Sequence, residues 1–262
     1  MFVPRQYQID CIDGNSRYPG IIKAWNEHKH VLSVLSTGTG KTCIFAMLAS
    51  RIVAQGGRVL VLAHREELIK QASEKIAAVT GLACAVEKAE LSSGGCLEMI
   101  TVGSIQSLIN PVRRSKINVP THIIVDECHH SVSDSYQAVL GQWPDADVLG
   151  VTATADRSDM KELGSYFDSL AFEYTLPEAI TQGYLSKIRA LTLPLKIDLS
   201  KCEMQNGDFA ANAVARALVP YLPHIGADIA EQGKDRKVLV FAPLCATAQE
   251  VQKYIEGAGL KC

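Results

Sequence analysis

The sequence predicts an α/β fold with a mostly parallel sheet and helices on both faces of that sheet. Short apolar runs, typical of strands buried on both faces, alternate with stretches whose apolar residues recur at helical spacing. The first run lies at residues 31–35, and a helix with Phe45, Leu48 and Ile52 on one face follows it. Further strands are predicted at residues 58–63, 97–102, 123–125, 147–154 and 172–175.

A phosphate-binding loop is predicted between the first strand and its helix. Two glycines there permit backbone angles that other residues resist, and the first N–H groups of the helix face an anion. Lys41 adds a charge for the outer phosphates of a nucleotide, and the Thr42 hydroxyl is a ligand for Mg²⁺. An ordinary glycine turn before a helix is the alternative. The predicted loop consists of Ser36, Thr37, Gly38, Thr39, Gly40, Lys41 and Thr42.

Two adjacent carboxylates, Asp126 and Glu127, follow the strand predicted at residues 123–125. Such charges are costly at the end of a buried strand unless a cation or hydrogen bonds compensate them. A magnesium nucleotide supplies that cation, with Asp126 holding Mg²⁺ directly or through water. Glu127 is expected to orient and deprotonate the attacking water. The predicted catalytic residues are therefore Lys41, Asp126 and Glu127, and the predicted metal ligands are Thr42 and Asp126.

Three polar side chains are expected to couple this site to the neighbouring surface. His129 follows the carboxylates, and Thr152 and Thr154 lie at the end of the strand at 147–154. The threonine hydroxyls are predicted to hydrogen-bond to Asp126 or to His129. For the threonines, the alternative is that β-branched residues simply favour a strand. For His129, the alternatives are a cap or a metal ligand.

Arg5 and Gln8 precede the first strand in a predicted amphipathic helix. A glutamine amide offers a donor and an acceptor and is able to read adenine, but a surface glutamine is the alternative. Arg65 lies at the C-terminal end of the strand at 58–63, the edge where ligands gather in open parallel sheets. It is predicted to grip a nucleic-acid phosphate, with an ion pair to a neighbouring glutamate as the alternative.

The composition is that of a soluble globular protein, with 47% hydrophobic and 21% charged residues in a chain of 262. No apolar run reaches the roughly 18 residues that span a membrane, and the N-terminus lacks the pattern of a signal peptide. A cytoplasmic protein is expected. The net charge of −2 means that any nucleic-acid contact comes from a local patch. The eight cysteines form no CxxC pair, which favours reduced thiols over a zinc site.

Two domains are predicted, with a first domain at residues 1–193, a linker at 194–207 and the start of a second domain at 208–262. A strand at 188–193 finishes the first domain. In the second, a buried strand at 237–242 is flanked by helical stretches. One strand flanked by helices cannot bury its own apolar faces. The second α/β domain is therefore expected to be incomplete.

Taken together, these stretches resemble superfamily 2 helicases of the DEAD/DEAH-box type. The similarity is nearest to the motor subunits of type III and type I restriction enzymes and to RadD-like repair helicases. The matches cover nearly the whole chain, in family order. They are RQYQ at 5–8 (adenine-reading segment), LSTGTGKT at 35–42 (motif I), LAHREEL at 62–68 (motif Ia), TVGSIQSL at 101–108 (motif Ib), VDECHH at 125–130 (motif II), GVTATADR at 150–157 (motif III), PEAITQGYL at 177–185 (end of the first motor domain) and KVLVFAP at 237–243 (motif IV).

The resemblance implies a RecA-like motor domain that binds ATP and Mg²⁺ and acts on nucleic acid, with DNA favoured over RNA but the sequence not deciding between them. It implies nucleic-acid contacts at Arg65, Thr101, Ser104 and Gln106, with helix capping as the alternative for Ser104. Ala155 replaces the usual proline after TAT. Motifs V and VI are absent, and an arginine such as motif VI supplies is worth roughly 10³–10⁵ in rate for related reactions. The chain is therefore expected to be truncated, to hydrolyse ATP slowly and not to unwind processively.

Two other functions are compatible with parts of the sequence. One is a non-motor nucleotide- or nucleic-acid-binding module, paired with a protein that supplies the rest of the second motor domain. The other is a different P-loop family, such as a kinase or a transporter ATPase. The DECH box and the TAT segment argue against that family.

Overall fold

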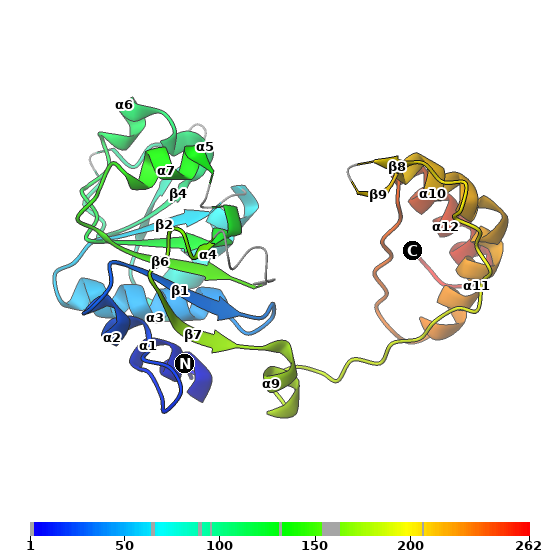
Figure 1. Ribbon diagram of the computed structural model, residues 1–262, viewed down its shortest axis with the longest axis horizontal. Coiled ribbons are helices and arrows are strands. Elements are labelled where there is room, and N and C mark those ends of the chain that lie inside the picture. Colours follow the sequence, from blue (N-terminus) through cyan, green and yellow to red (C-terminus); the bar gives the residue numbers. More distant parts are fainter. Residues whose placement is uncertain are drawn as a thin grey trace. The chain divides into compact units, whose positions relative to one another are not determined.

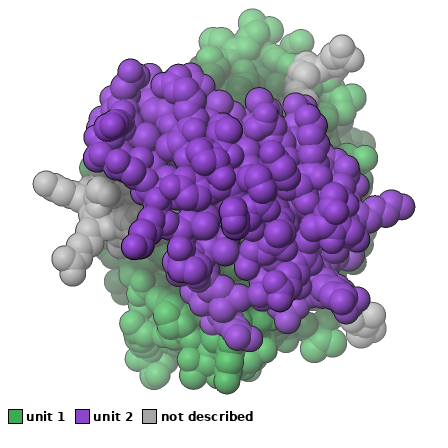
Figure 2. All heavy atoms as spheres, turned by 90° about the vertical axis from the view of Figure 1, so that its right-hand side faces the viewer, with its two compact units in different colours: residues 1–187 green, residues 188–262 purple. Residues whose placement is uncertain are grey.

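The computed structural model describes residues 3–63, 66–88, 91–94, 96–130, 133–153, 163–205 and 207–262, without the side chains of residues 66–68 and 130. The chain divides into two compact units (Figures 1 and 2). Unit 1 comprises residues 1–187, and unit 2 comprises residues 188–262. This division lies ahead of the domain boundary predicted at residue 193, which stays a prediction.

Unit 1 is built around a seven-stranded sheet with the order β3-β4-β2-β5-β6-β1-β7. Every neighbouring pair of strands is parallel. The predicted α/β class is confirmed, and the strand predicted at residues 172–175 lies within β7, at one edge of the sheet. The strands are β1 (His30–Leu35), β2 (Val59–Ala63), β3 (Cys84–Glu87), β4 (Ile100–Ser104), β5 (His122–Asp126), β6 (Asp147–Thr152) and β7 (Ser169–Tyr174).

Helices cover both faces of this sheet, because successive residues of a strand point to opposite sides. Val31 and Val61 are buried on one face, and Leu32 and Leu60 are buried on the other. The first face is covered by α1 (Gln6–Asp13), α2 (Ile21–Trp25), α3 (Lys41–Ala54), α4 (Glu66–Thr80) and α9 (Leu176–Thr181), and the second by α5 (Ile105–Leu108) and α7 (Asp134–Leu140) (Figure 1). Since both faces are closed by apolar cores, polar functional groups gather at the edges where strands end.

The strand order brings the segments after β1 and β5 to one edge. Strand β6 lies between these two strands, with Thr152 opposite Val34 and Val151 opposite Asp126. The carboxyl ends of parallel strands share an edge of the sheet. The loop after β1 and the carboxylates after β5 therefore meet over the end of β6.

Two strand predictions in unit 1 need correction. The third predicted strand is displaced, because Leu97 is 93% exposed and β4 begins only at Ile100. The register of β4 is set by its pairing with β2, in which Val59 lies opposite Ile100. An apolar run in the sequence does not specify where this pairing begins. The short edge strand β3 was not predicted, since it has only four residues, alternates half-buried with buried positions and ends on Glu87.

Within its described residues, unit 2 contains helices and a small hairpin but no parallel sheet. The strands predicted at 188–193 and 237–242 do not form. A strand exists through backbone hydrogen bonds to a neighbour, and the described part of unit 2 offers none to either segment. The elements present are β8 (Met204–Gln205), β9 (Asp208–Phe209), α10 (Ala211–Leu218), the 3₁₀ helix η2 (Val219–Tyr221), α11 (Leu222–Gln232) and α12 (Cys245–Gly257). Among the helices that the structure describes, none combines the length and apolar character that crossing a membrane requires.

Candidate nucleotide-binding site

The loop after β1 has the form of an anion cradle. Gly38 and Gly40 have φ angles of 85° and 79°, in the left-handed region that glycine tolerates. Thr39 closes the loop by donating its backbone N–H, at 3.3 Å, and its hydroxyl, at 2.6 Å, to the Ser36 carbonyl. The backbone N–H groups of residues 37, 38 and 40–42 have no acceptor in the described chain. These free donors at the start of α3 form a site for a phosphate group.

Helix α1 holds this loop in place through two side chains. The Tyr7 hydroxyl donates to the Thr39 carbonyl at 2.6 Å, and the Gln8 amide nitrogen donates to the same carbonyl at 3.1 Å. The Gln8 amide oxygen accepts from the Arg5 backbone N–H at 3.0 Å. Gln8 is only 3% exposed, so the alternative of a surface glutamine is wrong. Contact of Arg5 and Gln8 with adenine stays a prediction.

Gly40→Ala is expected to disable the cradle. The added Cβ would lie 2.8 Å from the Gln8 amide nitrogen, on a backbone whose positive φ already disfavours a side chain. Because this collision displaces the loop, we expect at least an approximately tenfold loss of ATP affinity, or about 1.4 kcal/mol, by isothermal titration calorimetry. Gly56→Ala is the matched control, since Gly56 has a φ of 82° and open space around its Cβ position. Equal ATP affinities in the two variants would contradict the assignment.

An aromatic cluster behind the cradle was missed by the sequence interpretation. The Tyr7 ring stacks on Tyr174 at 4.3 Å and meets Tyr184 edge-on at 4.9 Å. The Arg5 guanidinium lies over the Tyr184 ring, 5.2 Å from its centre. The signal available in the sequence was Tyr7 itself, which lies beside Gln8 in the predicted helix. Only the fold brings Tyr174 and Tyr184 to it.

The carboxylates after β5 reach the cradle. The Lys41 ammonium donates to the Glu127 carboxylate at 3.1 Å, and the Lys41 side chain is 13% exposed. Glu127 has a φ of 51°, which is uncommon for a residue other than glycine. The Asp126 carboxylate accepts from the Glu127 backbone N–H at 3.1 Å. The structure thus brings Lys41, Asp126 and Glu127 together, with the lysine paired to Glu127.

The surroundings of the Asp126 carboxylate disfavour its charged form. Its pKa is raised to about 6, first by burial and then by the neighbouring Glu127 carboxylate. The Lys41 charge and the hydrogen bond from the Glu127 N–H act in the opposite direction. A cation beside Asp126 would favour its charged form. The electrostatics of the site therefore suit a bound metal ion.

The donor set fits Mg²⁺. This ion prefers hard oxygen ligands and usually combines one or two carboxylates with water and substrate phosphates. The Thr42 hydroxyl and the second Asp126 oxygen make no hydrogen bond within the residues that the structure describes. No described group of three His, Cys, Asp or Glu side chains forms a ready metal cage. Thr42 and Asp126 are therefore the groups that would hold Mg²⁺ together with nucleotide phosphates.

Mg²⁺–ATP binding is expected to weaken below about pH 6, the raised pKa of Asp126. The metal needs the deprotonated carboxylate, so each pH unit below this value lowers the apparent affinity about tenfold. Without Mg²⁺, the free energy of unfolding changes with pH in the opposite direction. Folding raises this pKa, so the folded protein loses stability relative to the unfolded chain as pH rises from about 4 to about 6.

Mg²⁺ titrations of ATP binding at about pH 5 and about pH 7.5 measure the first effect. Asp126→Asn is the control, because an amide does not titrate. This variant should bind Mg²⁺–ATP weakly and with little pH dependence. An equally steep pH dependence in Asp126→Asn would assign the titration to another group.

Of the predicted coupling residues, His129 lies beside Glu127, and Thr152 lies beside His129. The 3₁₀ helix η1 (Cys128–His130) carries His129, whose Nδ1 lies 3.5 Å from Glu127 Oε2 and 3.5 Å from Thr152 Oγ1. Thr152 is completely buried at the end of β6. Thr154 lies outside the described residues. The coupling role of this group stays a prediction.

Of the residues predicted to contact nucleic acid, the structure describes Thr101, Ser104 and Gln106, and the first two are buried. Thr101 lies within β4 and is 6% exposed, which leaves little surface for a phosphate contact. Ser104 is also buried and caps α5 by accepting from the Ser107 N–H at 3.1 Å, so the capping alternative describes it. Gln106 is exposed. Arg65 lies outside the described residues.

Comparison with known proteins identifies the family. Residues 1–157, which include the cradle and both carboxylates, match the family described as type III restriction enzyme, res subunit. The chain belongs to this family. It is a superfamily 2 helicase-type protein of the restriction-motor branch, as the sequence resemblance predicted.

Relatives of this chain are considerably longer. The putative ATP-dependent helicase IRC3 of Saccharomyces cerevisiae is 29% identical over 79% of this chain and 31% of its own length. The type I restriction enzyme EcoAI endonuclease subunit of Escherichia coli is 26% identical over 75% of this chain and 25% of its own length. The chain thus spans a third or less of these two relatives.

A solved structure confirms the fold. The Hef helicase domain of Pyrococcus furiosus aligns with 97% of this chain and 53% of its own chain, with a TM-score of 0.53 and 22% sequence identity. The RecA-like architecture predicted for the first domain is therefore correct.

Proposed function

We propose that unit 1 is an ATP-binding and ATP-hydrolysing motor domain of a helicase or translocase that acts on nucleic acid. The observation that carries this proposal is the 3.1 Å contact between the Lys41 ammonium and the Glu127 carboxylate. It joins the phosphate cradle after β1 to the acidic pair after β5. Phosphoryl transfer from a nucleotide relies on such an arrangement, because its catalysis is mostly positioning and charge stabilisation.

Each group has a distinct role in this reaction. Lys41 and the free N–H groups of the cradle bind the phosphates. Thr42 and Asp126 would hold Mg²⁺, and the ion would neutralise charge on the phosphate oxygens. Glu127 orients the attacking water and accepts its proton. Phosphate oxygens compete with Glu127 for Lys41, and a Glu127 released from the lysine is free to act as this base.

Nucleic acid is the proposed partner, with DNA favoured over RNA. The relative named as a type I restriction endonuclease subunit supports DNA, and the relative named as an ATP-dependent helicase supports a nucleic-acid motor. Exposed Gln106 follows β4 at the carboxyl edge of the sheet, and it is proposed to contact this partner. His129 and Thr152 are proposed to couple this surface to Glu127 through their 3.5 Å contacts.

A second candidate function is a nucleotide-binding module that acts with a partner protein rather than as a motor. The phosphate cradle favours it as well, because the free N–H groups after β1 suffice to bind a nucleotide without movement along nucleic acid. Such a module would bind ATP, and its turnover would not respond to nucleic acid.

ATP turnover by the 262-residue chain, measured with and without single-stranded DNA, duplex DNA and RNA, tests these functions. The motor function predicts turnover that DNA stimulates and that Glu127→Gln abolishes. ATP binding without any stimulation would favour the partner-dependent module. Turnover that is indifferent to Glu127 would remove the proposed catalytic site.

A further inference from the structure

The core of unit 1 contains a tyrosine hydroxyl without a hydrogen-bond partner. Tyr136 on α7 is 1% exposed, and its hydroxyl makes no hydrogen bond within the residues that the structure describes. Two other buried side-chain atoms share this property, but Glu87 forms an ion pair with Arg113 at 2.7 Å, and Arg114 donates to two carbonyls through another nitrogen. A buried polar group without a partner lowers stability, so it calls for an explanation.

The packing of α7 places this side chain beside the end of β5. Tyr136 belongs to the same buried cluster as Val125 and Cys128, which lie directly before and after the two carboxylates of the site. Burial, and after it the charge of Asp126, raises the pKa of the Tyr136 hydroxyl to about 12. The hydroxyl is therefore protonated at neutral pH, and it lies within electrostatic reach of Asp126.

The Asp126 carboxylate has an acceptor to spare. One of its oxygens accepts from the Glu127 N–H at 3.1 Å, and the other makes no hydrogen bond within the described chain. A hydrogen bond donated to a carboxylate favours its charged form. A tyrosine hydroxyl supplies such a bond without a positive charge, so it does not repel a metal ion bound to the same carboxylate.

We propose that Tyr136 is a positioning residue, whose hydroxyl donates a hydrogen bond to the Asp126 carboxylate when Mg²⁺ and nucleotide are bound. In the structure these two groups are not bonded to each other, so the bond requires a reorientation of the Asp126 side chain. It fixes the direction of the carboxylate and favours the charged form that ligates a metal ion. This inference rests on the proposed function, because that function assigns Asp126 to Mg²⁺.

Tyr136→Phe is expected to change stability and metal affinity in opposite directions. Without nucleotide, the variant should unfold at a temperature roughly 2 °C higher, because it lacks the unpaired hydroxyl. Its apparent Mg²⁺ affinity in the presence of ATP should fall about 10–100-fold, the usual effect of losing a partner of a metal ligand. Thermal unfolding and calorimetric titrations with Mg²⁺ measure the two effects. ATP turnover should approach the wild-type rate at saturating Mg²⁺.

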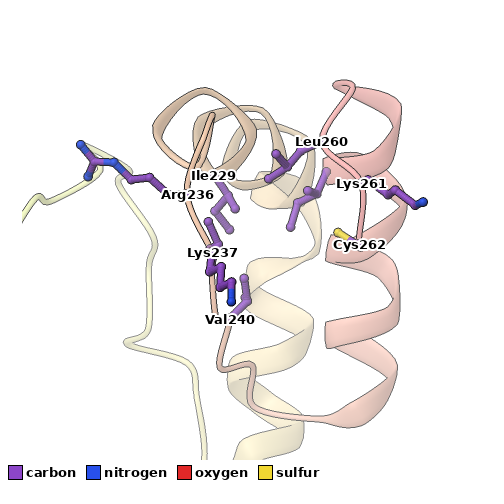
Figure 3. A pocket seen from close by; sticks show the side chains of 9 residues that line it. Ile229, Arg236, Lys237, Val240, Leu260, Lys261 and Cys262 are labelled. Carbon is purple, nitrogen blue, oxygen red and sulfur yellow. The ribbon is translucent and has the colours of Figure 1, made fainter.

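Two controls separate these effects from general changes in packing. Tyr166→Phe removes a hydroxyl from a ring that packs against the same cluster but stacks on His30, at the amino end of β1. Ile255→Ala truncates a buried side chain of unit 2 that lines a pocket of about 480 Å³ (Figure 3). This second variant should unfold at a lower temperature. Both controls should keep the Mg²⁺ affinity of the wild type.

An Asp126→Asn background distinguishes failure of this inference from failure of the proposed function. In that background Tyr136→Phe should cause no further loss of Mg²⁺ affinity, because the two changes remove the same interaction. Wild-type Mg²⁺–ATP binding by Asp126→Asn alone would remove the proposed metal site.

The role of Tyr136 alone would be overturned by two results. One is wild-type Mg²⁺ affinity in Tyr136→Phe while Asp126→Asn binds weakly, which would make the hydroxyl a packing group whatever its effect on unfolding. The other is an equal loss of affinity from Tyr136→Phe with and without Asp126→Asn, which would show that the hydroxyl acts through another group.

Discussion

Replacing Glu127 by glutamine should lower ATP turnover by about 10²–10⁴-fold, the usual contribution of a positioned general base. The amide is nearly isosteric, keeps the backbone at its positive φ, and cannot accept the proton of the attacking water. ATP binding should persist or tighten, because a neutral side chain no longer competes with phosphate for the Lys41 ammonium. Steady-state turnover and isothermal titration with ATP measure the two effects separately.

The matched control for this variant is Glu74→Gln. Glu74 lies on α4 and pairs with Lys70 at 3.8 Å across an exposed surface, so it loses the same charge without touching the cradle. Turnover and ATP affinity should both stay at the wild-type level in this control. If Glu127→Gln hydrolysed ATP at the wild-type rate, Glu127 would not be the base. If it lost ATP binding instead, Glu127 would have a structural role.

Replacing Lys41 by alanine should weaken ATP binding by roughly 30-fold or more. Removal of one member of a buried charge pair costs about 2–5 kcal/mol, and Lys41 is 13% exposed. The variant also leaves Glu127 without its cation, so the unfolding free energy should fall. Titration calorimetry with ATP and denaturant unfolding measure these changes.

Two further variants separate the effect of the Lys41–Glu127 ion pair on stability from the role of Lys41 in binding phosphate. In Lys41→Ala/Glu127→Gln the unpaired carboxylate is gone, so stability should recover relative to Lys41→Ala while ATP affinity stays low. Lys70→Ala removes an exposed lysine from a surface pair and should leave ATP affinity unchanged. Wild-type ATP affinity in Lys41→Ala would refute the phosphate cradle.

The strands of unit 1 were predictable where a parallel sheet buries them on both faces. Most residues of β1, β2 and β5 are buried, and each strand is built around apolar residues, with Ser33 as an interruption in β1. Edge strand β3 alternates buried with half-buried residues and was missed. Strand β4 was displaced because its register depends on β2. Edges and registers depend on neighbours that a local pattern does not identify.

The members of the site were predictable, but their contacts were not. Spacing pointed to Lys41 and to the Asp126–Glu127 pair, yet it did not indicate which carboxylate holds the lysine. The positive φ of Glu127 decides this, because it sets the direction of that side chain. Likewise, the buried contacts of Tyr7 and Gln8 with Thr39 follow from the packing of α1 beside the loop.

By itself, the sequence determined which residues carry the chemistry and which class of fold holds them. These features can each be recognised in a short stretch of sequence. They are the conformational freedom of glycine, the spacing of apolar residues and the acidic residues at the end of a strand. The tertiary structure decided which atoms meet: Lys41 with Glu127, and α1 with the Thr39 carbonyl. It also decided that residues 237–242 stay unpaired in the described chain. A strand forms when its backbone groups hydrogen-bond to a neighbouring strand, and the sequence of one segment does not specify that neighbour.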